Sequence, residues 1–176
     1  VSFYDYDKHE PYLNHFDTTG VKVYLQVESG LADMNELIDI VMTRYKHHES
    51  VIGFGVDVEW FNAAGSNDMN ETEYPVTDAL AQLWLEKTQE HKEYYGLFLK
   101  HWLTSMMPAT YRGNANASIV FLDDSQQFND LNSAVAEFDN WADHFAPSPV
   151  MFQIGYESDY EKVWKNLANP VQDFGL

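Results

Sequence analysis

The sequence predicts an α/β fold in which parallel strands are covered by helices. Short apolar runs bounded by turn residues alternate with segments of helical periodicity, which indicates βα units. The strands turn polar on one face toward their C-terminal ends, whereas strands of a doubly wound sheet are usually apolar on both faces. Such one-sided strands are typical of a (β/α)8 barrel. A complete barrel needs about 250 residues, so the 176 residues of this chain predict one domain, residues 1–176, forming a partial or trimmed TIM barrel.

The first half of the chain is predicted to form a strand, a helix and a second strand. Residues 21–28 alternate apolar and polar side chains, as a half-buried strand does. A helix is expected over residues 33–47, where Asp33 and Glu36 form a capping-box pattern. Residues 51–60 read VIGFGVDVEW and form the next strand, with large apolar side chains on one face only. A strand over residues 1–6 and a helix over residues 9–16 are expected to precede these elements.

The second half continues the same alternation. After a polar loop, Thr77 is the expected N-cap of a helix that extends to residue 92. Strands follow at residues 96–102 and 118–126. The segment between them, around residues 106–114, is too short for a covering helix. The last expected elements are a helix over residues 130–145, a strand over residues 149–157 and a helix over residues 160–167.

Polar side chains gather where each of the five strands ends. The carboxyl ends of parallel strands converge on one mouth, and enzymes of this class keep their chemistry there. We therefore expect a ligand site at this mouth, the alternative being a set of solvated strand ends. The residues expected to bind the ligand are Gln26, Glu28, Trp60, Lys100, Trp102, Asp123, Ser125, Gln153, Tyr156 and Glu157.

Asp57 and Glu59 are the candidate catalytic residues. Two residues on one face of a strand lie about 6.6–7 Å apart along the chain, so their carboxylates should raise the pKa of one of the pair. A carboxylic acid with a raised pKa is suited to protonating a leaving oxygen. Gly53 and Gly55 on the same face leave space for a substrate or for bulky neighbouring side chains.

Residues 51–60 resemble the signature of the family 18 glycoside hydrolases, the chitinase-like barrels, which carry Asp-Gly-x-x-Asp-x-Asp-x-Glu-like motifs on one strand. The resemblance implies that Glu59 protonates the glycosidic oxygen and that Asp57 orients the acetamido group of the substrate. Gly55 stands where the family has its next aspartate, and the aromatic residue falls after the glutamate, as Trp60.

The late stretch from residue 151 to residue 156 reads MFQIGY and is similar to the family's Met-x-Tyr-like strand. The resemblance implies that Gln153 and Tyr156 contact sugar. An inactive, sugar-binding descendant of such a barrel would carry the same residues.

The composition excludes several classes of partner. Asp and Glu number 28 against 10 Lys and Arg, a formal net charge of −18, so nucleic acids and anionic membranes are poor partners. No apolar run approaches the roughly 20 residues of a membrane span. The chain has no Cys, which excludes disulfides and thiol chemistry. Two glycosylation sequons, at Asn70 and Asn116, are compatible with secretion.

Signals for cofactors are weak. No cofactor is expected, although calcium needs only oxygen ligands. Those ligands would be the mouth carboxylates, or the loop residues Asn67, Asp68, Asn70 and Glu71. His47 and His48 end a helix, where cations are favoured in any case, so no metal ligands are assigned. Nucleotide-binding motifs and a nucleophile elbow are absent from the sequence.

Two functions follow from these patterns. The first is a carbohydrate-active, glycoside-hydrolase-like protein in which Glu59 is the general acid, Asp57 is its partner, and Glu28, Asp123 or Glu157 is the second carboxylate. The second is a non-catalytic, extracellular or cell-surface structural protein of barrel ancestry, which assembles with copies of itself or binds glycans. The acidic charge and the short length favour the second function. A chain too short for a complete barrel leaves open sheet edges, which can pair with another copy.

Overall fold

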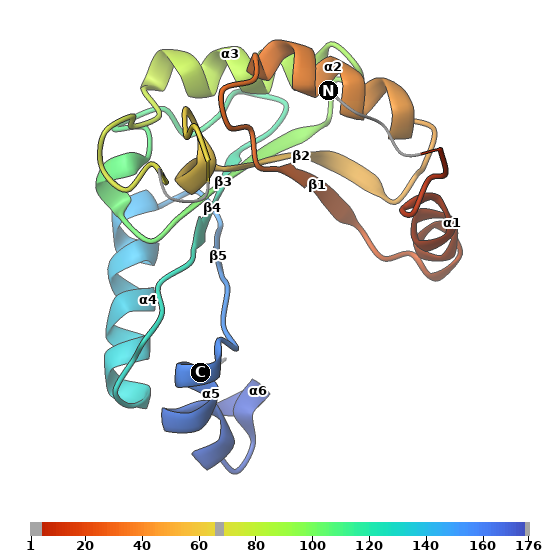
Figure 1. Ribbon diagram of the computed structural model, residues 1–176. Coiled ribbons are helices and arrows are strands. Elements are labelled where there is room, and N and C mark those ends of the chain that lie inside the picture. The colour runs from red at the N-terminus through yellow and green to blue at the C-terminus, as the bar shows by residue number, and fades with distance from the viewer. Residues whose placement is uncertain (1–4, 66–68, 175–176) are drawn as a thin grey trace.

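A computed structural model, which describes residues 5–65 and 69–174, contains a five-stranded sheet whose strands are all parallel (Figure 1). The strands are β1 (Val23–Val27), β2 (Val51–Asp57), β3 (Gly96–His101), β4 (Ile119–Asp123) and β5 (Val150–Phe152). They follow one another across the sheet in chain order, and the sheet is not closed, so β1 and β5 form its edges. The predicted α/β class is confirmed.

Helices cover one face of this sheet. The connecting helices are α2 (Met34–Tyr45), α3 (Asp78–Gln89) and α4 (Leu131–Phe145). Because the strand order never reverses and parallel crossovers share one hand, successive connections fall on the same side. Figure 1 shows the three helices on the convex side of a curved sheet. As expected, the connection from β3 to β4 has no covering helix, only the short turn η2 (Thr104–Met106).

The predicted helix starts are set by side-chain caps. The Asp33 carboxylate accepts hydrogen bonds from the backbone N–H groups of Asn35 and Glu36 at the start of α2. The Thr77 hydroxyl accepts one from Leu80 at the start of α3. Such caps satisfy backbone donors that have no partner inside the helix, and each contributes about 1 kcal/mol.

The ends of the chain differ from the predictions. Helix α1 (Glu10–Thr19) corresponds to the expected first helix and ends at Gly20, whose φ of 76° is left-handed. The expected strand over residues 1–6 falls mainly on residues 1–4, which lie outside the described residues, and Asp5 and Tyr6 form a bend. At the other end the chain forms α5 (Glu157–Lys162), η3 (Trp164–Asn166) and α6 (Pro170–Phe174).

All five strands are shorter than predicted. β2 ends at Asp57, after which the 3-10 turn η1 (Val58–Trp60) closes with a hydrogen bond from Phe61 N–H to the Val58 carbonyl. β5 ends at Phe152, not at residue 157. No helix in the described part of the chain is long and apolar enough to cross a membrane.

The main core lies between the convex face of the sheet and the helices. Phe54, Leu99 and Phe121 point toward the helices and are fully buried. The Phe121 ring stacks on Phe145 of α4, with ring centroids 4.0 Å apart. Burying one such side chain stabilises the fold by about 1.5–3 kcal/mol, so this face holds the helices on the sheet.

The concave face carries a second, smaller apolar cluster. It consists of Phe98, Val120 and Leu122, with Tyr24 packed against them. The Phe98 ring covers Gly55, where a Cβ atom would lie 2.2 Å from the ring. Of the two uses predicted for the glycines on this face, the structure shows the second, because neighbouring aromatic side chains fill the space they leave.

We predict that alanine at either concave-face glycine destabilises the fold. The Cβ atom of Gly55→Ala meets the movable Phe98 ring, whereas that of Gly53→Ala lies 2.2 Å from the backbone oxygen of Gly96. Overpacking costs about 1–3 kcal/mol, and Gly53→Ala should cost more because backbone yields less than a side chain. Urea unfolding measures both losses. Gly65→Ala, which meets nothing within 4 Å, is the control, and equal stability of the three variants would contradict the prediction.

Candidate functional site

A buried lysine organises the carboxyl ends of the strands. Lys100 lies near the end of β3, in register with Asp57 at the end of β2. Its Nζ atom lies 2.9 Å from Asp57 Oδ2, 3.1 Å from Glu59 Oε1 and 2.5 Å from Asp124 Oδ2. Three carboxyl groups therefore surround one ammonium group.

An outer set of hydrogen bonds holds two of these carboxylates. Gln26 of β1 donates from Nε2 to Asp57 Oδ2 at 3.1 Å. The Tyr156 hydroxyl donates to Asp124 Oδ1 at 2.9 Å, and it accepts in turn from Gln153 Nε2 at 2.5 Å. Six of the residues predicted from sequence thus meet in one site: Gln26, Asp57, Glu59, Lys100, Gln153 and Tyr156.

Burial sets the protonation of the site. The exposed fraction is 5% for Lys100 and 8% for Glu59. Desolvation, the contact with Asp124 and the charge of Asp57 together raise the pKa of Glu59 to about 8. Burial also raises the pKa of Asp57, against the opposing charge of Lys100. The three carboxylates more than offset desolvation of the ammonium and raise the pKa of Lys100. At neutral pH Glu59 therefore carries a proton, and Lys100 is a cation, not a nucleophilic amine.

Asp124, not Asp123, is the β4 carboxylate of the site, so the prediction for Asp123 is wrong. Asp123 shares the convex face of its strand with Phe121, and its Oδ1 accepts from Ser125 N–H at 2.7 Å. Burial raises the pKa of Asp123 to about 6. The Asp124 backbone N–H donates to the His101 carbonyl, which continues the strand pairing by one residue and turns the Asp124 side chain to the concave face.

Two more predicted residues lie toward the helices or beside the site. Ser125 Oγ donates to Glu137 Oε1 of α4 at 3.1 Å, so the prediction that Ser125 faces the mouth is wrong. The Trp102 ring stacks on His101, with centroids 4.1 Å apart, and is half buried.

The remaining predicted residues form the surroundings of the cluster. Glu28 is exposed just beyond β1, and its charge contributes to the raised pKa of Asp57. Trp60 is half buried in η1, next to Glu59 in the chain. Glu157 is exposed in the first turn of α5. None of the hydrogen bonds found among the described residues joins Glu28, Trp60 or Glu157 to the Lys100 cluster.

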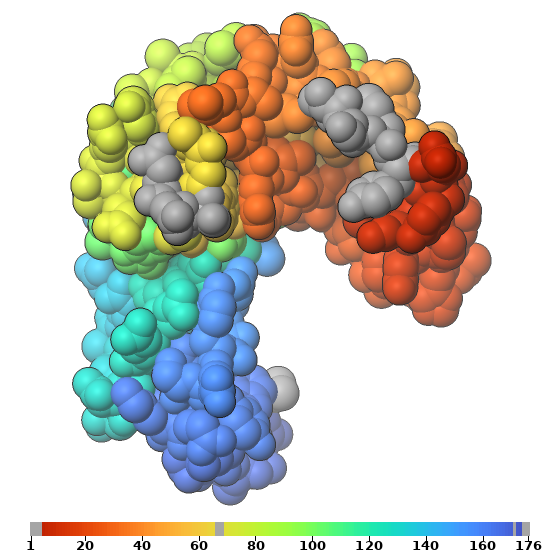
Figure 2. All heavy atoms as spheres, viewed as in Figure 1, coloured from red at the N-terminus to blue at the C-terminus, as the bar shows by residue number. Residues whose placement is uncertain are grey.

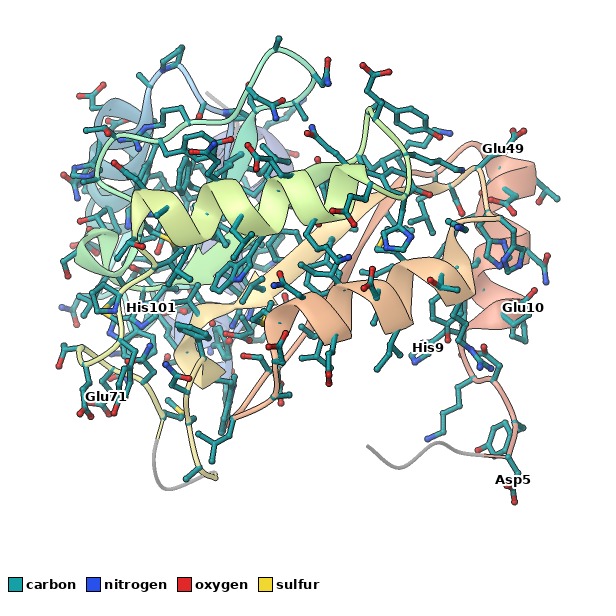
Figure 3. The ribbon with its side chains drawn as sticks, turned by 90° about the horizontal axis from the view of Figure 1, so that it is seen from above. Asp5, His9, Glu10, Glu49, Glu71 and His101 are labelled. Atoms are coloured by element: carbon teal, nitrogen blue, oxygen red, sulfur yellow. The ribbon has the colours of Figure 1, made fainter. Side chains whose placement is uncertain are left out.

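Asn70 holds the loop after η1 against the site. Its backbone N–H donates to the Glu59 carbonyl at 2.6 Å, and its carbonyl oxygen lies 3.1 Å from His101 Nε2. His101 Nδ1 accepts from Leu103 N–H, so Nε2 carries the proton and donates to Asn70. Burial lowers the pKa of His101 to about 4. Figure 3 shows His101 inside the molecule and Glu71 at the outer side of the loop.

The position of Asn70 bears on the predicted calcium ligands and on the predicted glycosylation sequons. Of the possible calcium ligands, Asn67 and Asp68 lie outside the described residues. The Asn70 side chain is 3% exposed, and its Nδ2 donates to the carbonyls of Val58 and Tyr74. Asn70 is therefore a structural residue of the loop, and Asn116, which is exposed, is the accessible one of the two sequons.

The Lys100 cluster lies at the concave face of the sheet. Figure 2 shows a broad hollow on the concave side of the molecule, between α1 and the C-terminal segment. A small cavity of about 70 Å³ lies beside the cluster and not within it, lined by Asn62, Met69, Asn70, Glu73 and Tyr74. That volume holds a few water molecules and no sugar ring, so a larger ligand would have to bind on the open face.

We predict that Glu59 makes the stability of the fold depend on pH. In the unfolded chain Glu59 loses its proton near pH 4.5, but in the native site only near pH 8. Its stabilising contribution is therefore complete below about pH 4.5 and declines as the pH rises toward about 8. Glu59→Gln, which mimics the protonated acid, removes this decline.

Urea unfolding at several pH values measures the effect as the difference between wild type and Glu59→Gln. The wild type should lose stability relative to the variant by at most about 1.4 kcal/mol per pH unit. His101 has the opposite sign, since its lowered pKa costs stability as the pH falls from 6.5 toward about 4, but it is present in both proteins and cancels. Parallel stability curves would show that Glu59 titrates normally.

Comparison with protein-family models, with curated proteins and with solved structures finds no match to this chain.

Proposed function

We propose that this chain is a carbohydrate-active, glycoside-hydrolase-like protein in which Glu59 acts as the general acid. The observation that carries the proposal is the Glu59 carboxyl group, which holds its proton at neutral pH at the carboxyl end of a parallel sheet. Two further carboxylates contact the same lysine. Cleavage of a glycosidic bond needs such a pair of unlike carboxyl groups, one protonated and one ionised.

The scaffold we propose is part of a (β/α) barrel. The strand order has no reversal, the connecting helices α2, α3 and α4 lie on one face, and the sheet curves with its other face inside. These are features of barrel strands, whereas an open doubly wound sheet has helices on both faces. In this arrangement the Lys100 cluster lies at the mouth, where barrel enzymes hold their catalytic groups.

The geometry favours a compact site over a widely spaced one. The contacting oxygens of Asp57 and Glu59 both lie within 3.1 Å of one nitrogen. These two oxygens are therefore close together. In inverting glycosidases the two carboxyl groups are roughly 6.5–9.5 Å apart, which leaves room for a water molecule between them. The proposal accordingly excludes an inverting mechanism for the Asp57–Glu59 pair.

Asp57 offers a contact for the substrate. Its Oδ1 atom is buried and has no hydrogen-bond partner among the described residues, while Oδ2 is held by Lys100 and Gln26. A buried acceptor without a donor is costly, and a substrate hydroxyl or acetamido N–H would satisfy it. This agrees with the role that the family resemblance implies for Asp57. We also propose an extracellular or cell-surface location, for which the exposed sequon at Asn116 and the net charge of −18 are the support.

We predict that Glu59→Gln lowers kcat for a hydrolysed glycan by about 10²–10⁴-fold, the usual contribution of a general acid. Asp57→Asn should raise KM or lower kcat through loss of the substrate contact. Activity of the wild type should decline as the pH rises through about 8, because the acid form of Glu59 is lost. Release of reducing ends from a panel of glycans, N-acetylated ones included, is the measurement.

Glu36→Gln, on the exposed surface of α2, is the control and should retain full activity. If the wild type hydrolyses a glycan and Glu59→Gln does so equally well, the assignment of the acid is wrong. If the wild type hydrolyses none of the panel, the catalytic proposal is wrong and the second candidate function remains.

The second candidate is a non-catalytic protein that assembles with copies of itself. The observation that favours it is the open sheet, because β1 and β5 each leave one side without a partner strand among the described residues. Unpaired strand edges are templates for pairing with another chain. On β5, Met151 is 44% exposed, so the edge carries an apolar side chain.

We predict that a self-assembled protein loses association when a charge is placed on this edge. Met151→Lys should shift the sedimentation coefficient toward that of the monomer, because edge lysines oppose strand pairing. Leu83→Lys is the matched control, since Leu83 is 45% exposed on α3, away from both edges. A wild type that sediments as a monomer at all concentrations would contradict self-assembly.

A further inference from the structure

Three potential metal ligands meet at the end of the sheet where the strands begin. Glu10 lies in the first turn of α1, and His47 and His48 lie in the turn between α2 and β2. His48 Nε2 is 3.2 Å from Glu10 Oε2, and His47 Nε2 is 3.4 Å from Glu10 Oε1. Figure 3 shows Glu10 on α1, beside the end of α2.

The spacing of these atoms suits a tetrahedral metal ion. Two ligand atoms that each lie about 2.0–2.1 Å from a tetrahedral zinc ion are about 3.3–3.4 Å apart. The two separations, 3.2 Å from His48 to Oε2 and 3.4 Å from His47 to Oε1 of the same carboxylate, are close to such an edge. The three donor atoms all lie within 4.8 Å of one another, so an ion could bind with small rotations of the side chains.

A second carboxylate prepares His48 for this role. Asp17 Oδ2 lies 2.8 Å from His48 Nδ1, and Asp17 Oδ1 accepts from Ser50 N–H at 2.7 Å. The Asp17 carboxylate can only accept, so Nδ1 keeps its proton, and a metal ion would take the place of the proton that Nε2 shares with Glu10 in this structure. Metal-bound histidines almost always have such a partner on the other ring nitrogen. The His48 side chain is 1% exposed, which fixes its orientation.

We propose that Glu10, His47 and His48 bind a zinc-class divalent ion. Two imidazoles and one carboxylate suit zinc and its neighbours in the first transition series, and they suit magnesium or calcium poorly. Three protein ligands leave a fourth position for water. The His47 side chain is 58% exposed, so an ion reaches the site from solvent.

The ion would fasten α1 to the sheet. Leu13 is the buried residue of α1, and Phe16 packs partly against the core. Asp7, just before the helix, contacts Arg44 and Tyr45. A metal bridge from Glu10 to the turn before β2 would add a link at the exposed side. Because this site lies at the opposite end of β2 from Asp57, its failure and that of the proposed catalytic site can be distinguished.

Isothermal titration calorimetry of the full chain with zinc chloride tests the proposal. We expect one zinc ion per chain, a rise in Tm that EDTA reverses, and no comparable rise with calcium. Glu10→Gln and His47→Ala should each weaken zinc binding by at least about tenfold through loss of one ligand. Both residues are partly exposed, so these variants keep the test valid if a substitution at buried His48 prevents folding.

Asp17→Asn tests the positioning of His48. The asparagine can still accept from Ser50, but its amide group would donate to Nδ1 and leave the proton on Nε2, where it blocks the metal. We expect zinc affinity to decrease by about 10–100-fold. His15→Ala, an exposed histidine of the same helix, is the control and should bind zinc as the wild type does. Zinc binding that is absent, or that is equal in wild type and Glu10→Gln, would overturn the proposal.

Discussion

The buried ammonium of Lys100 is the constraint on which the rest of the candidate site depends. A buried charge costs several kcal/mol unless it is paired, and Lys100 is 5% exposed. The fold therefore has to bring carboxylates to it from separate parts of the chain. Asp57 arrives in register from β2, Glu59 through the turn η1, and Asp124 one residue beyond β4. Three carboxyl groups exceed what one cation neutralises, so one of them keeps a proton. That one is Glu59, whose pKa is raised by desolvation together with the neighbouring Asp124 and Asp57. The acid of the proposed reaction is thus a consequence of how the lysine is buried.

The alternation of apolar and polar residues along a strand predicts the site residues only where the two faces of that strand differ in polarity. In β2 the glycines and Asp57 occupy one face and large apolar residues the other, so the concave face could be read directly from the sequence. β4 gives no such signal, because Ile119, Val120 and Phe121 are all apolar and buried. A shift of one residue exchanges the faces of a strand, and for this reason the pattern predicts Asp123 at the mouth, where the structure has Asp124. The end of β2 at Asp57 could not be predicted either, because Val58 and Trp60 of η1 continue the apolar alternation of the strand.

Contacts between distant segments away from the strand ends could not be predicted. The α/β class follows from local periodicity, but closure of the sheet depends on pairing between its edges, which no local pattern encodes. Glu10 and His48 are 38 residues apart in the chain, and they meet because α1 packs across the turn before β2. In sequence, His47 and His48 form an ordinary helix end. The role of Asp17 could be inferred only from the structure, in which its carboxylate lies 2.8 Å from His48 Nδ1.

The aromatic cover of the concave face limits where a ligand can lie. Tyr24 and Phe98 pack edge to face, with centroids 5.6 Å apart, over the space that Gly53, Gly55 and Gly96 leave free. The middle of the sheet is therefore filled by the protein itself, and a sugar could not enter there without displacing both rings. Beyond these rings lies the Lys100 cluster, whose least buried carboxyl group is Glu59, with a side chain 11% exposed against 3% for Asp57 and 2% for Asp124. In the proposed function, a substrate that approaches from the mouth would reach Glu59 more easily than the other two carboxyl groups, and general acid catalysis requires that the acid lie within hydrogen-bond reach of the leaving oxygen.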